Sequence, residues 1–234
     1  MQIFYTPDIA IKPELPEEEA GHCIRVLRLG EGDEIVLTDG QGSFYKAAIS
    51  RAHPKHCEVT LLESWKQPDL WNFNLHIAIA PTKNMDRMEW FVEKATEIGI
   101  NAITCLNCRF SERKEIKPIR LEKILVSAMK QSQKATLPAL EGMTDFKKFV
   151  ATPFDGRKFI AHCEEGEKPL LKHTYQPGEN ALILIGPEGD FRADLFRREP
   201  AAYGNGRTSG LPYDSCVKSI ESVHCHIKND TNIE

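Results

Sequence analysis

The sequence predicts an α/β protein that consists of a small N-terminal β-barrel over residues 1–70 and a parallel-sheet domain over residues 74–234. Residues 1–70 contain several short apolar runs separated by turn signals such as Asp39-Gly40, a pattern typical of compact barrels. From residue 74 onward, apolar runs with strand character alternate with amphipathic helical patterns. Such alternation implies crossover connections between strands and therefore a parallel sheet.

In the N-terminal part, the pattern predicts four strands and one helical segment. Pro16 and the three glutamates after it favour a helix start, because acidic side chains stabilise the positive end of a helix dipole. Apolar residues at helical spacing continue the helix over residues 22–29, and Gly30 is a natural end. A proline-containing stretch at residues 65–72 is expected to be a linker. The predicted strands are residues 1–5, 34–38, 44–49 and 57–62.

In the C-terminal part, the clearest helix is predicted over residues 85–98, where apolar residues recur every three or four positions and Gly99 closes the pattern. A second amphipathic helix is expected over residues 119–133. The predicted strands are residues 75–80, 102–106, 159–163 and 181–185.

The best site candidate is the end of the last of these strands. The apolar run at residues 181–185 stops abruptly in Gly186-Pro187-Glu188-Gly189. Glycine allows backbone conformations that are closed to other residues, and proline fixes one torsion between the two glycines. Ligands of open α/β sheets bind just outside the carboxyl ends of such strands, so a ligand site is expected here.

Composition narrows the function classes. The chain has 234 residues, 41% of them hydrophobic, and a formal net charge of −4, so its overall charge does not indicate a nucleic-acid binder, although a local basic patch is compatible with this average. Its seven cysteines show no disulfide or zinc spacing, because Cys105-x-x-Cys108 has no second pair to complete four ligands. No targeting signal or long apolar run is evident, which indicates a soluble, cytoplasmic protein with reduced cysteines, no membrane partner and no metal.

Five motifs occur in an order and spacing that resemble one family. They are His22-Cys23-Ile24-Arg25-Val26-Leu27-Arg28, Pro81-Thr82-Lys83 with Asp86-Arg87-Met88-Glu89-Trp90, Glu93-Lys94-Ala95-Thr96-Glu97-Ile98-Gly99, Lys130-Gln131-Ser132 and Ile185-Gly186-Pro187-Glu188-Gly189. Over residues 1 to about 191 the chain therefore resembles the RsmE family, bacterial methyltransferases that act on uracil N3 of 16S ribosomal RNA.

The resemblance implies a fold and an activity. It implies an N-terminal RNA-binding barrel of the PUA type and a C-terminal SPOUT domain whose parallel sheet threads a loop into a deep trefoil knot. Family members are homodimers that hold S-adenosylmethionine in the knot loops near the subunit interface. The implied activity is S-adenosylmethionine-dependent methylation of N3 of a specific uridine in the 16S rRNA of the small ribosomal subunit.

The resemblance also indicates site residues. Uracil N3 must lose its proton before it attacks the methyl group, so the site needs a base or a group that stabilises the anion. His162, Glu164 and Glu188 are the candidates; His162 and Glu164 could instead be solvated strand-end residues, and Glu188 could instead hold its loop by accepting backbone N–H bonds. The residues expected to contact the cofactor are Leu184, Ile185, Gly186, Pro187, Glu188, Gly189, His162 and Gly204.

Basic residues in both parts are candidates for contacts with RNA phosphates. Each could equally belong to a solvated charged face, and a lysine late on a helix could cap the helix end. The candidates are Arg25, Arg28, Lys83, Arg87, Arg109, Arg113, Lys114 and Lys130.

The C-terminal tail departs from the family pattern after Phe191. The family continues with a segment that completes the knot and much of the cofactor pocket, whereas residues 208–234 do not echo it. Codons for residues 211–217, read from their second nucleotide, permit Phe-Arg-Thr-Thr-Ala-Ala-Leu, which is close to the missing motif. We therefore hypothesise a frameshift between Phe191 and Leu211, which DNA sequencing tests.

Two further hypotheses compete with methyl transfer. A tail that truly lacks the last pocket wall would give a non-catalytic RNA-binding protein that binds S-adenosylmethionine weakly or not at all. A small-molecule enzyme with a flavodoxin-like sheet would need a glycine-rich phosphate loop after the first strand of the C-terminal domain, and residues 81–84 contain no glycine.

Overall fold

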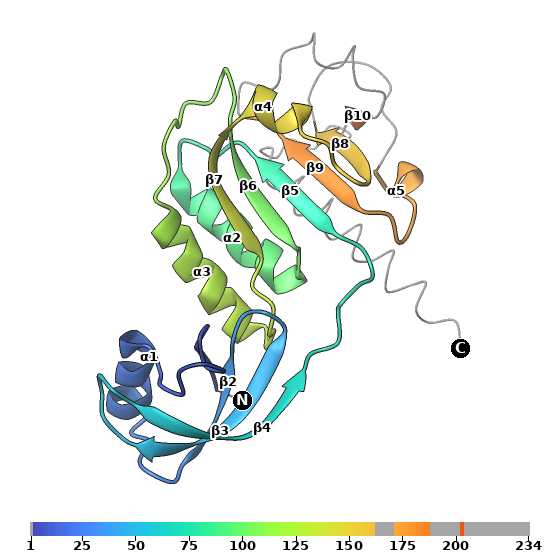
Figure 1. The fold of residues 1–234 in the computed structure, drawn as a ribbon. Coiled ribbons are helices and arrows are strands. Elements are labelled where there is room, and N and C mark those ends of the chain that lie inside the picture. Colours follow the sequence, from blue (N-terminus) through green and yellow to red (C-terminus); the bar gives the residue numbers. More distant parts are fainter. Residues whose placement is uncertain (1, 162–170, 188–201, 204–234) are drawn as a thin grey trace. The chain divides into compact units, whose positions relative to one another are not determined.

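The computed structural model describes residues 2–161, 171–187 and 202–203 (Figure 1). The chain folds into two compact units. The first contains Met1–Leu70 together with Leu125–Leu137, and the second contains Trp71–Ile124 together with Pro138–Glu234.

The first unit contains a four-stranded sheet in the order β1-β2-β3-β4, in which β1 is parallel to β2 and the other neighbours are antiparallel. All four predicted strands are confirmed, and the last one continues through Lys66 into the stretch that was expected to be a linker. The strands are β1 (Ile3–Tyr5), β2 (Glu34–Thr38), β3 (Ser43–Arg51) and β4 (Glu58–Lys66).

The turn between β2 and β3 is organised by Asp39 and Gly40. The Asp39 carboxylate oxygen Oδ1 accepts hydrogen bonds from the backbone N–H groups of Gln41 (2.7 Å) and Ser43 (3.1 Å). Gly40 adopts a left-handed φ of 75°, and a Cβ at this position would lie 2.8 Å from the Tyr5 ring. Glycine is therefore required here both by its torsion and by the close approach of Tyr5.

The helical segment of the first unit begins as predicted. The helix α1 (Glu17–Gly21) follows Pro16 and carries three acidic residues in its first turn. The chain then widens into the π-helix η1 (His22–Val26), in which the N–H of Leu27 donates to the carbonyl of His22 over 3.1 Å. The helix predicted over residues 22–29 is therefore confirmed only over residues 22–26, and it is a π-helix, because apolar spacing alone does not distinguish an α-turn from the wider π-turn.

Arg28 ends this helical segment in an unusual backbone conformation. Its φ is 58°, the left-handed region that favours glycine. The N–H of Leu29 closes the helix end by donating to the carbonyl of Cys23 over 3.2 Å, the arrangement of a left-handed helix cap. Gly30, the expected end, lies two residues beyond the position that adopts the cap conformation.

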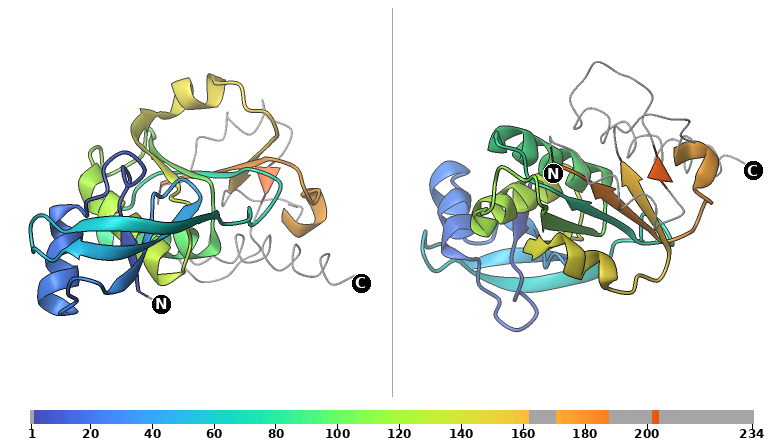
Figure 2. Two further views of the ribbon diagram at one scale, coloured as in Figure 1. Left: turned by 60° about the horizontal axis from the view of Figure 1, so that its bottom comes forward. Right: turned by 90° about the horizontal axis from the view of Figure 1, so that it is seen from above.

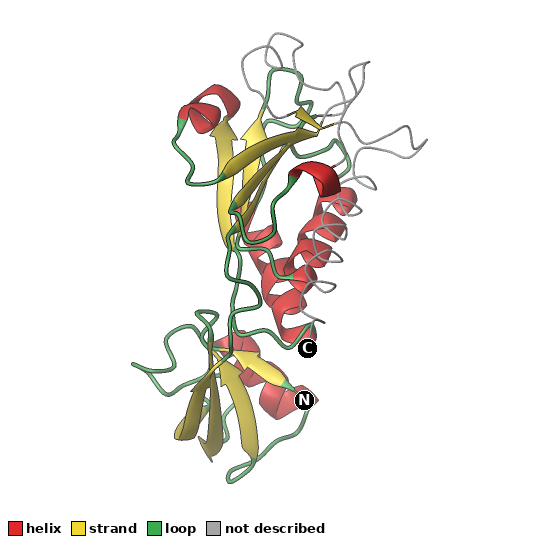
Figure 3. Cartoon of the chain, turned by 90° about the vertical axis from the view of Figure 1, so that its right-hand side faces the viewer, coloured by secondary structure: helices red, strands yellow, loops and turns green. Residues whose placement is uncertain are grey.

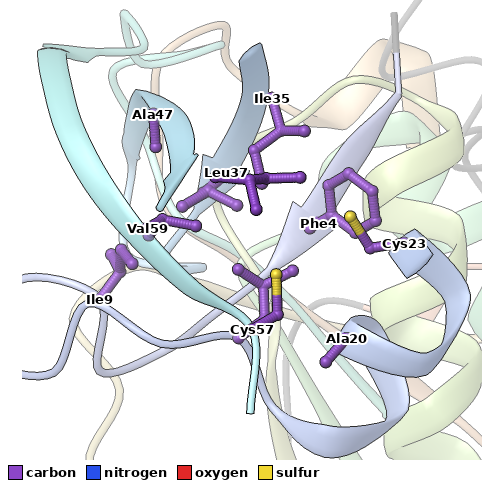
Figure 4. Packing of buried hydrophobic residues seen from close by; sticks show 11 residues of the cluster. Phe4, Ile9, Ala20, Cys23, Ile35, Leu37, Ala47, Cys57 and Val59 are labelled. Atoms are coloured by element: carbon purple, nitrogen blue, oxygen red, sulfur yellow. The ribbon is translucent and has the colours of Figure 1, made fainter. Parts of the chain in front are cut away.

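The core of the first unit lies between the sheet and the helical segment (Figure 4). Phe4 of β1, Leu37 of β2 and Cys23 of η1 are almost completely buried. Each large apolar side chain buried in this way contributes roughly 1.5–3 kcal/mol to folding. The cluster comprises Phe4, Ile9, Leu15, Ala20, Cys23, Ile35, Leu37, Ala47, Ile49, Cys57 and Val59.

The segment Leu125–Leu137 belongs to the first unit although it comes much later in the chain. Within it, Ala135 is fully buried and shares a small apolar cluster with Ile3 and Phe44. The carbonyl of Ala135 also accepts a hydrogen bond from the N–H of Gly42 over 2.9 Å. Nothing in the sequence pattern predicted this contribution.

The second unit is built on a six-stranded sheet in the order β10-β8-β9-β5-β6-β7, and every described pairing in it is parallel. The parallel sheet is thus confirmed, and β9, which carries the predicted site, is paired with β8 on one side and β5 on the other. The strands are β5 (Leu75–Ile79), β6 (Ala102–Asn107), β7 (Ala139–Asp145), β8 (Arg157–Ala161), β9 (Ala181–Ile185) and β10 (Ala202–Tyr203).

Helices cover both faces of this sheet (Figure 2). The helix α4 (Phe146–Ala151) packs on one face, where Phe146 joins an apolar cluster with sheet residues such as Leu182 and Leu184. The helix α2 (Met85–Ile98) lies on the opposite face and ends at Gly99, whose φ is 101°. The first part of α3 (Pro118–Gln131) lies beside α2, where the Arg120 guanidinium pairs with Glu89, and the short α5 (Leu171–Thr174) precedes β9. Figure 3 shows the strands of the sheet in yellow and the helices in red.

Candidate functional site

The predicted site lies at the carboxyl end of β9, in the interior of the parallel sheet. All five residues of β9 are buried, whereas Gly186 is partly exposed and Pro187 is buried again. The Leu184 and Ile185 side chains retain 1% and 2% of their exposure. These two predicted cofactor residues therefore lie in the core, and Gly186 is the first residue after the strand that is partly exposed.

The loop that follows β5, the strand paired with β9, lies beside the carboxyl end of β9. The N–H of Ala80, directly after β5, donates to the carbonyl of Ile185 over 2.9 Å. Thr82 is buried, and its hydroxyl donates to the carbonyl of Asn84 over 2.6 Å. Asn84 in turn caps α2 by accepting the N–H of Asp86 over 2.9 Å. The 81–84 loop is thus an ordered neighbour of Gly186.

A basic segment, residues 108–114, leaves the end of the next strand, β6. The Arg113 guanidinium donates to the carbonyls of Thr82 (Nε, 3.2 Å) and Lys83 (Nη2, 2.7 Å). The Lys114 ammonium donates to the carbonyl of Cys108 over 3.0 Å. Carbonyls beyond the ends of parallel strands have no ladder partner; the two cations donate to three of them, and the Cys108 carbonyl also accepts the N–H of Ser111 over 3.2 Å.

Several predicted site residues fall outside the described residues. These are the three catalytic candidates His162, Glu164 and Glu188, together with the cofactor candidates Gly189 and Gly204. The last described residue of β8, Ala161, pairs with Ile185 at the end of β9.

The basic residues predicted to contact RNA divide into two groups. Arg25 and Arg28 are exposed at the end of η1, beside Val26, which keeps 64% of its exposure. Arg109 is also exposed, with its guanidinium 5.5 Å from the centre of the Phe110 ring, and Arg87 on α2 is partly buried.

The second group has protein partners. Lys130 of α3 pairs with Glu19 of α1 over 2.5 Å, and these side chains keep only 24% and 11% of their exposure. Lys83 pairs with Glu112 over 3.3 Å at a far more exposed position. Lys83, Lys130, Arg113 and Lys114 thus all have partners within the protein. The positive charge of a residue in the sequence did not indicate which of the candidates have such partners.

Three polar side chains from neighbouring strands form a hydrogen-bonded network that was not predicted from the sequence. The Nε2 atom of His76 lies 2.8 Å from the Thr104 hydroxyl, which donates to Glu141 over 2.8 Å. The ring edge of Phe149 covers His76 at a centroid distance of 5.6 Å. Burial lowers the pKa of His76, an effect that the nearby Glu141 carboxylate partly opposes. The sequence feature that could have indicated this polar network is His76 itself, because the other residues of its strand are apolar.

The described residues do not support a metal site. Among them, no group of three or more His, Cys, Asp or Glu side chains could hold an ion. Cys105 and Cys108 are buried free thiols, and burial raises their pKa values to about 12 and about 11, so both stay protonated near neutral pH. Within the same residues, every helix is too short or too polar to cross a bilayer.

Two family models match the chain. Residues 69–196 match an RNA methyltransferase domain, and residues 15–62 match an RNA methyltransferase PUA domain. The first match covers more than half of the chain and includes β9 and Gly186.

Similar proteins have related names. A crystal structure of a probable rRNA-methyltransferase from Porphyromonas gingivalis is 36% identical, with a TM-score of 0.91 over 99% of this chain and 100% of that one. The ribosomal RNA small subunit methyltransferase E of Rickettsia conorii is 26% identical over 86% of this chain and 82% of its own length. The methyltransferase E of Neisseria gonorrhoeae, solved bound to S-adenosylmethionine, has the same fold, with 20% identity and a TM-score of 0.83 over 97% of this chain and 98% of that one.

Proposed function

The chain belongs to the RNA methyltransferase family, and from this premise we propose that it methylates N3 of a specific uridine in the 16S rRNA of the small ribosomal subunit with S-adenosylmethionine. The observation that carries the proposal is the match of residues 69–196 to an RNA methyltransferase domain. The matched region includes β9 and the residues Gly186 and Pro187 that follow its carboxyl end. The relatives named ribosomal RNA small subunit methyltransferase E support rRNA as the substrate class.

The reaction defines what the site must supply. The N3–H proton of uracil is removed, N3 forms a bond to the methyl carbon, and the bond from that carbon to the sulfonium breaks. The products are N3-methyluridine, S-adenosylhomocysteine and a proton. His162, Glu164 and Glu188 are the proposed candidates for the group that accepts this proton or orients the base.

The described edge suits a cofactor held mainly by backbone groups. Gly186 presents main chain without a side chain at the point where β9 emerges from the core, and Pro187 fixes the direction of the chain that follows. Ile185 has a buried side chain and a carbonyl that already accepts the N–H of Ala80, so its role is to anchor this loop. Glu188, Gly189, His162 and Gly204 are proposed to complete the cofactor contacts.

RNA binding is assigned to the exposed arginines. Arg25 and Arg28 face solvent on a rigid, capped segment of the PUA-type unit, which suits contacts with backbone phosphates. Arg87 and Arg109 are proposed to add contacts from the second unit. Lys83 and Lys130, which have acidic partners, are expected to contribute less.

The proposed enzyme is a cytoplasmic homodimer with a trefoil-knotted SPOUT domain. These three features come from the resemblance to the RsmE family. The knot and the cofactor pocket require the chain after Phe191, so they depend on the tail that the frameshift hypothesis concerns.

Methyl transfer to purified small ribosomal subunits tests the proposal. Subunits from cells that lack the modification are incubated with the chain and isotopically labelled S-adenosylmethionine, and the nucleosides are separated by mass spectrometry. Labelled N3-methyluridine is expected. A chain with the tail restored to the family pattern is the matched control, and label on another base atom, or no label with either chain, contradicts the proposal.

A second candidate function is non-catalytic RNA binding. The departure of the sequence after Phe191 favours it, because the missing pattern supplies much of the cofactor pocket in the family. Calorimetry separates the two functions: a chain that binds 16S rRNA fragments but shows no heat with S-adenosylmethionine has lost the pocket.

A further inference from the structure

Arg113 joins two loops that leave the carboxyl ends of neighbouring strands. Its Nε atom donates to the carbonyl of Thr82 (3.2 Å), and its Nη2 atom donates to the carbonyl of Lys83 (2.7 Å). A planar guanidinium can hold two adjacent carbonyls in this forked way, whereas an ammonium acts as a single point charge. The 81–84 loop after β5 is therefore fastened to the 108–114 segment after β6.

The segment that carries Arg113 is itself held firmly. The N–H of Cys108 donates to the Ser111 hydroxyl (3.0 Å), and the N–H of Ser111 donates back to the carbonyl of Cys108 (3.2 Å). Ser111 is buried. Lys114 donates to the same Cys108 carbonyl and to the Asn107 side chain (3.3 Å). Arg113 thus projects from a fixed turn.

The loop that Arg113 holds is next to the proposed cofactor edge. β5 pairs with β9 along its whole length, and the N–H of Ala80 donates to the carbonyl of Ile185, one residue before Gly186. A displacement of the 81–84 loop would therefore be transmitted to the start of the cofactor loop. Displacements of about 1 Å near a reacting centre can cost on the order of a hundredfold in rate.

We propose that Arg113 is a positioning residue for the methyl transfer, which holds the 81–84 loop against the edge of the sheet where Gly186 and Pro187 begin the cofactor loop, and that it does not bind an RNA phosphate. This inference rests on the proposed use of that edge for S-adenosylmethionine. Two of the five guanidinium N–H donors serve these carbonyls, and the two bonds fix the orientation of the group toward the loop.

The test compares Arg113→Gln, Arg113→Lys and Lys117→Gln in the full chain. Lys117 is an exposed residue three positions after this segment, so Lys117→Gln is a control that removes the same charge. Hydrogen exchange of peptides that cover residues 80–87 reports loop order, and calorimetry without RNA reports affinity for S-adenosylmethionine. RNA binding is measured as a function of salt concentration.

In Arg113→Gln, the two hydrogen bonds from the guanidinium to the Thr82 and Lys83 carbonyls are lost. Amide hydrogen exchange at residues 80–87 is therefore expected to become faster, and S-adenosylmethionine binding to weaken by about tenfold. Arg113→Lys is expected to restore the charge but not the affinity, because lysine cannot donate to both carbonyls in the same geometry. The apparent KM for RNA and the salt slope of RNA binding should stay at their original values, and Lys117→Gln should leave loop exchange and cofactor affinity unchanged.

Three outcomes would overturn the inference: unchanged exchange at residues 80–87, unchanged cofactor affinity despite faster exchange, or a salt slope of RNA binding that falls by about 0.7 and is restored by lysine. Failure of the proposed function has a different signature. If the unaltered chain binds no S-adenosylmethionine, the cofactor assignment fails, and loop exchange alone decides whether Arg113 holds the 81–84 loop.

Discussion

The exposed arginines of the first unit and the cations after β6 in the second carry the same charge but have different partners. Arg25 and Arg28 lie at the exposed end of η1. Arg113 and Lys114 donate to backbone carbonyls. The difference follows from local structure, because a helix end closed by its own backbone needs no side-chain donor, whereas loops that leave parallel strands carry unpaired carbonyls. The prediction of RNA contacts is therefore kept for Arg25 and Arg28, whereas Arg113 and Lys114 have a role within the fold.

The largest effect is expected from a cation held by a nearly buried partner. Lys130→Met should lower the free energy of unfolding by about 3 kcal/mol, because Glu19 would stay buried without its counter-ion. Urea unfolding measures the change, and Lys117→Met is the exposed control. Full stability together with weaker RNA binding in Lys130→Met would place Lys130 with the arginines that we propose to bind RNA.

Removal of the exposed pair should change RNA binding and leave the fold intact. For Arg25→Gln/Arg28→Gln, the slope of log affinity against log salt concentration should become shallower by about 1.4, at about 0.7 for each phosphate contact on single-stranded RNA. The free energy of unfolding should change by less than about 0.5 kcal/mol. An unaltered slope would remove the distinction between the two groups of cations.

The backbone of Arg28 can be tested apart from its charge. Arg28→Gly and Arg28→Ala both remove the guanidinium, but only glycine accepts a φ of 58° without strain. The glycine variant should be more stable than the alanine variant by about 1 kcal/mol, with equal losses of RNA affinity. Equal stabilities in thermal unfolding would mean that this left-handed cap is not maintained in solution.

The smallest effect concerns His76, a titratable group whose only described hydrogen bond is to Thr104. Because burial holds its folded pKa below the unfolded value, the unfolded chain binds more protons, and the free energy of unfolding should fall as pH drops below about 6.5. His76→Gln should flatten this part of the stability curve. An unchanged slope in this variant, measured by urea unfolding at a series of pH values, would contradict the assignment.

Local pattern predicted most of the fold. The bounds of β2, β9 and α2 agree with the sequence prediction to the residue, because uninterrupted periodicity and glycine ends define them. β7 was missed, since Ala139–Asp145 contains a glycine and two acidic residues and is largely exposed. The π-turn of η1 was missed because it changes hydrogen bonding without changing which residues are apolar.

The candidate site could be predicted in position but not in detail. Gly186 marked the correct end of a buried parallel strand, whereas the burial of the Leu184 and Ile185 side chains depends on both neighbouring strands. The partners of Arg113, Lys83 and Lys130 come from distant parts of the chain or from loop geometry, and no single-sequence pattern encodes them. The catalytic assignments to His162, Glu164 and Glu188 stay predictions.

The buried Ala135 has a consequence for how the molecule is made. Its contacts with Ile3 and Phe44 complete the smaller unit, yet more than half of the chain must be synthesised before residue 135 exists. During synthesis, the apolar surface formed by Ile3 and Phe44 therefore stays uncovered while β5, α2 and β6 are made. A fragment that stops at Leu70 would lack Ala135 and leave this side of the N-terminal sheet uncovered, so the N-terminal unit is not expected to fold stably by itself.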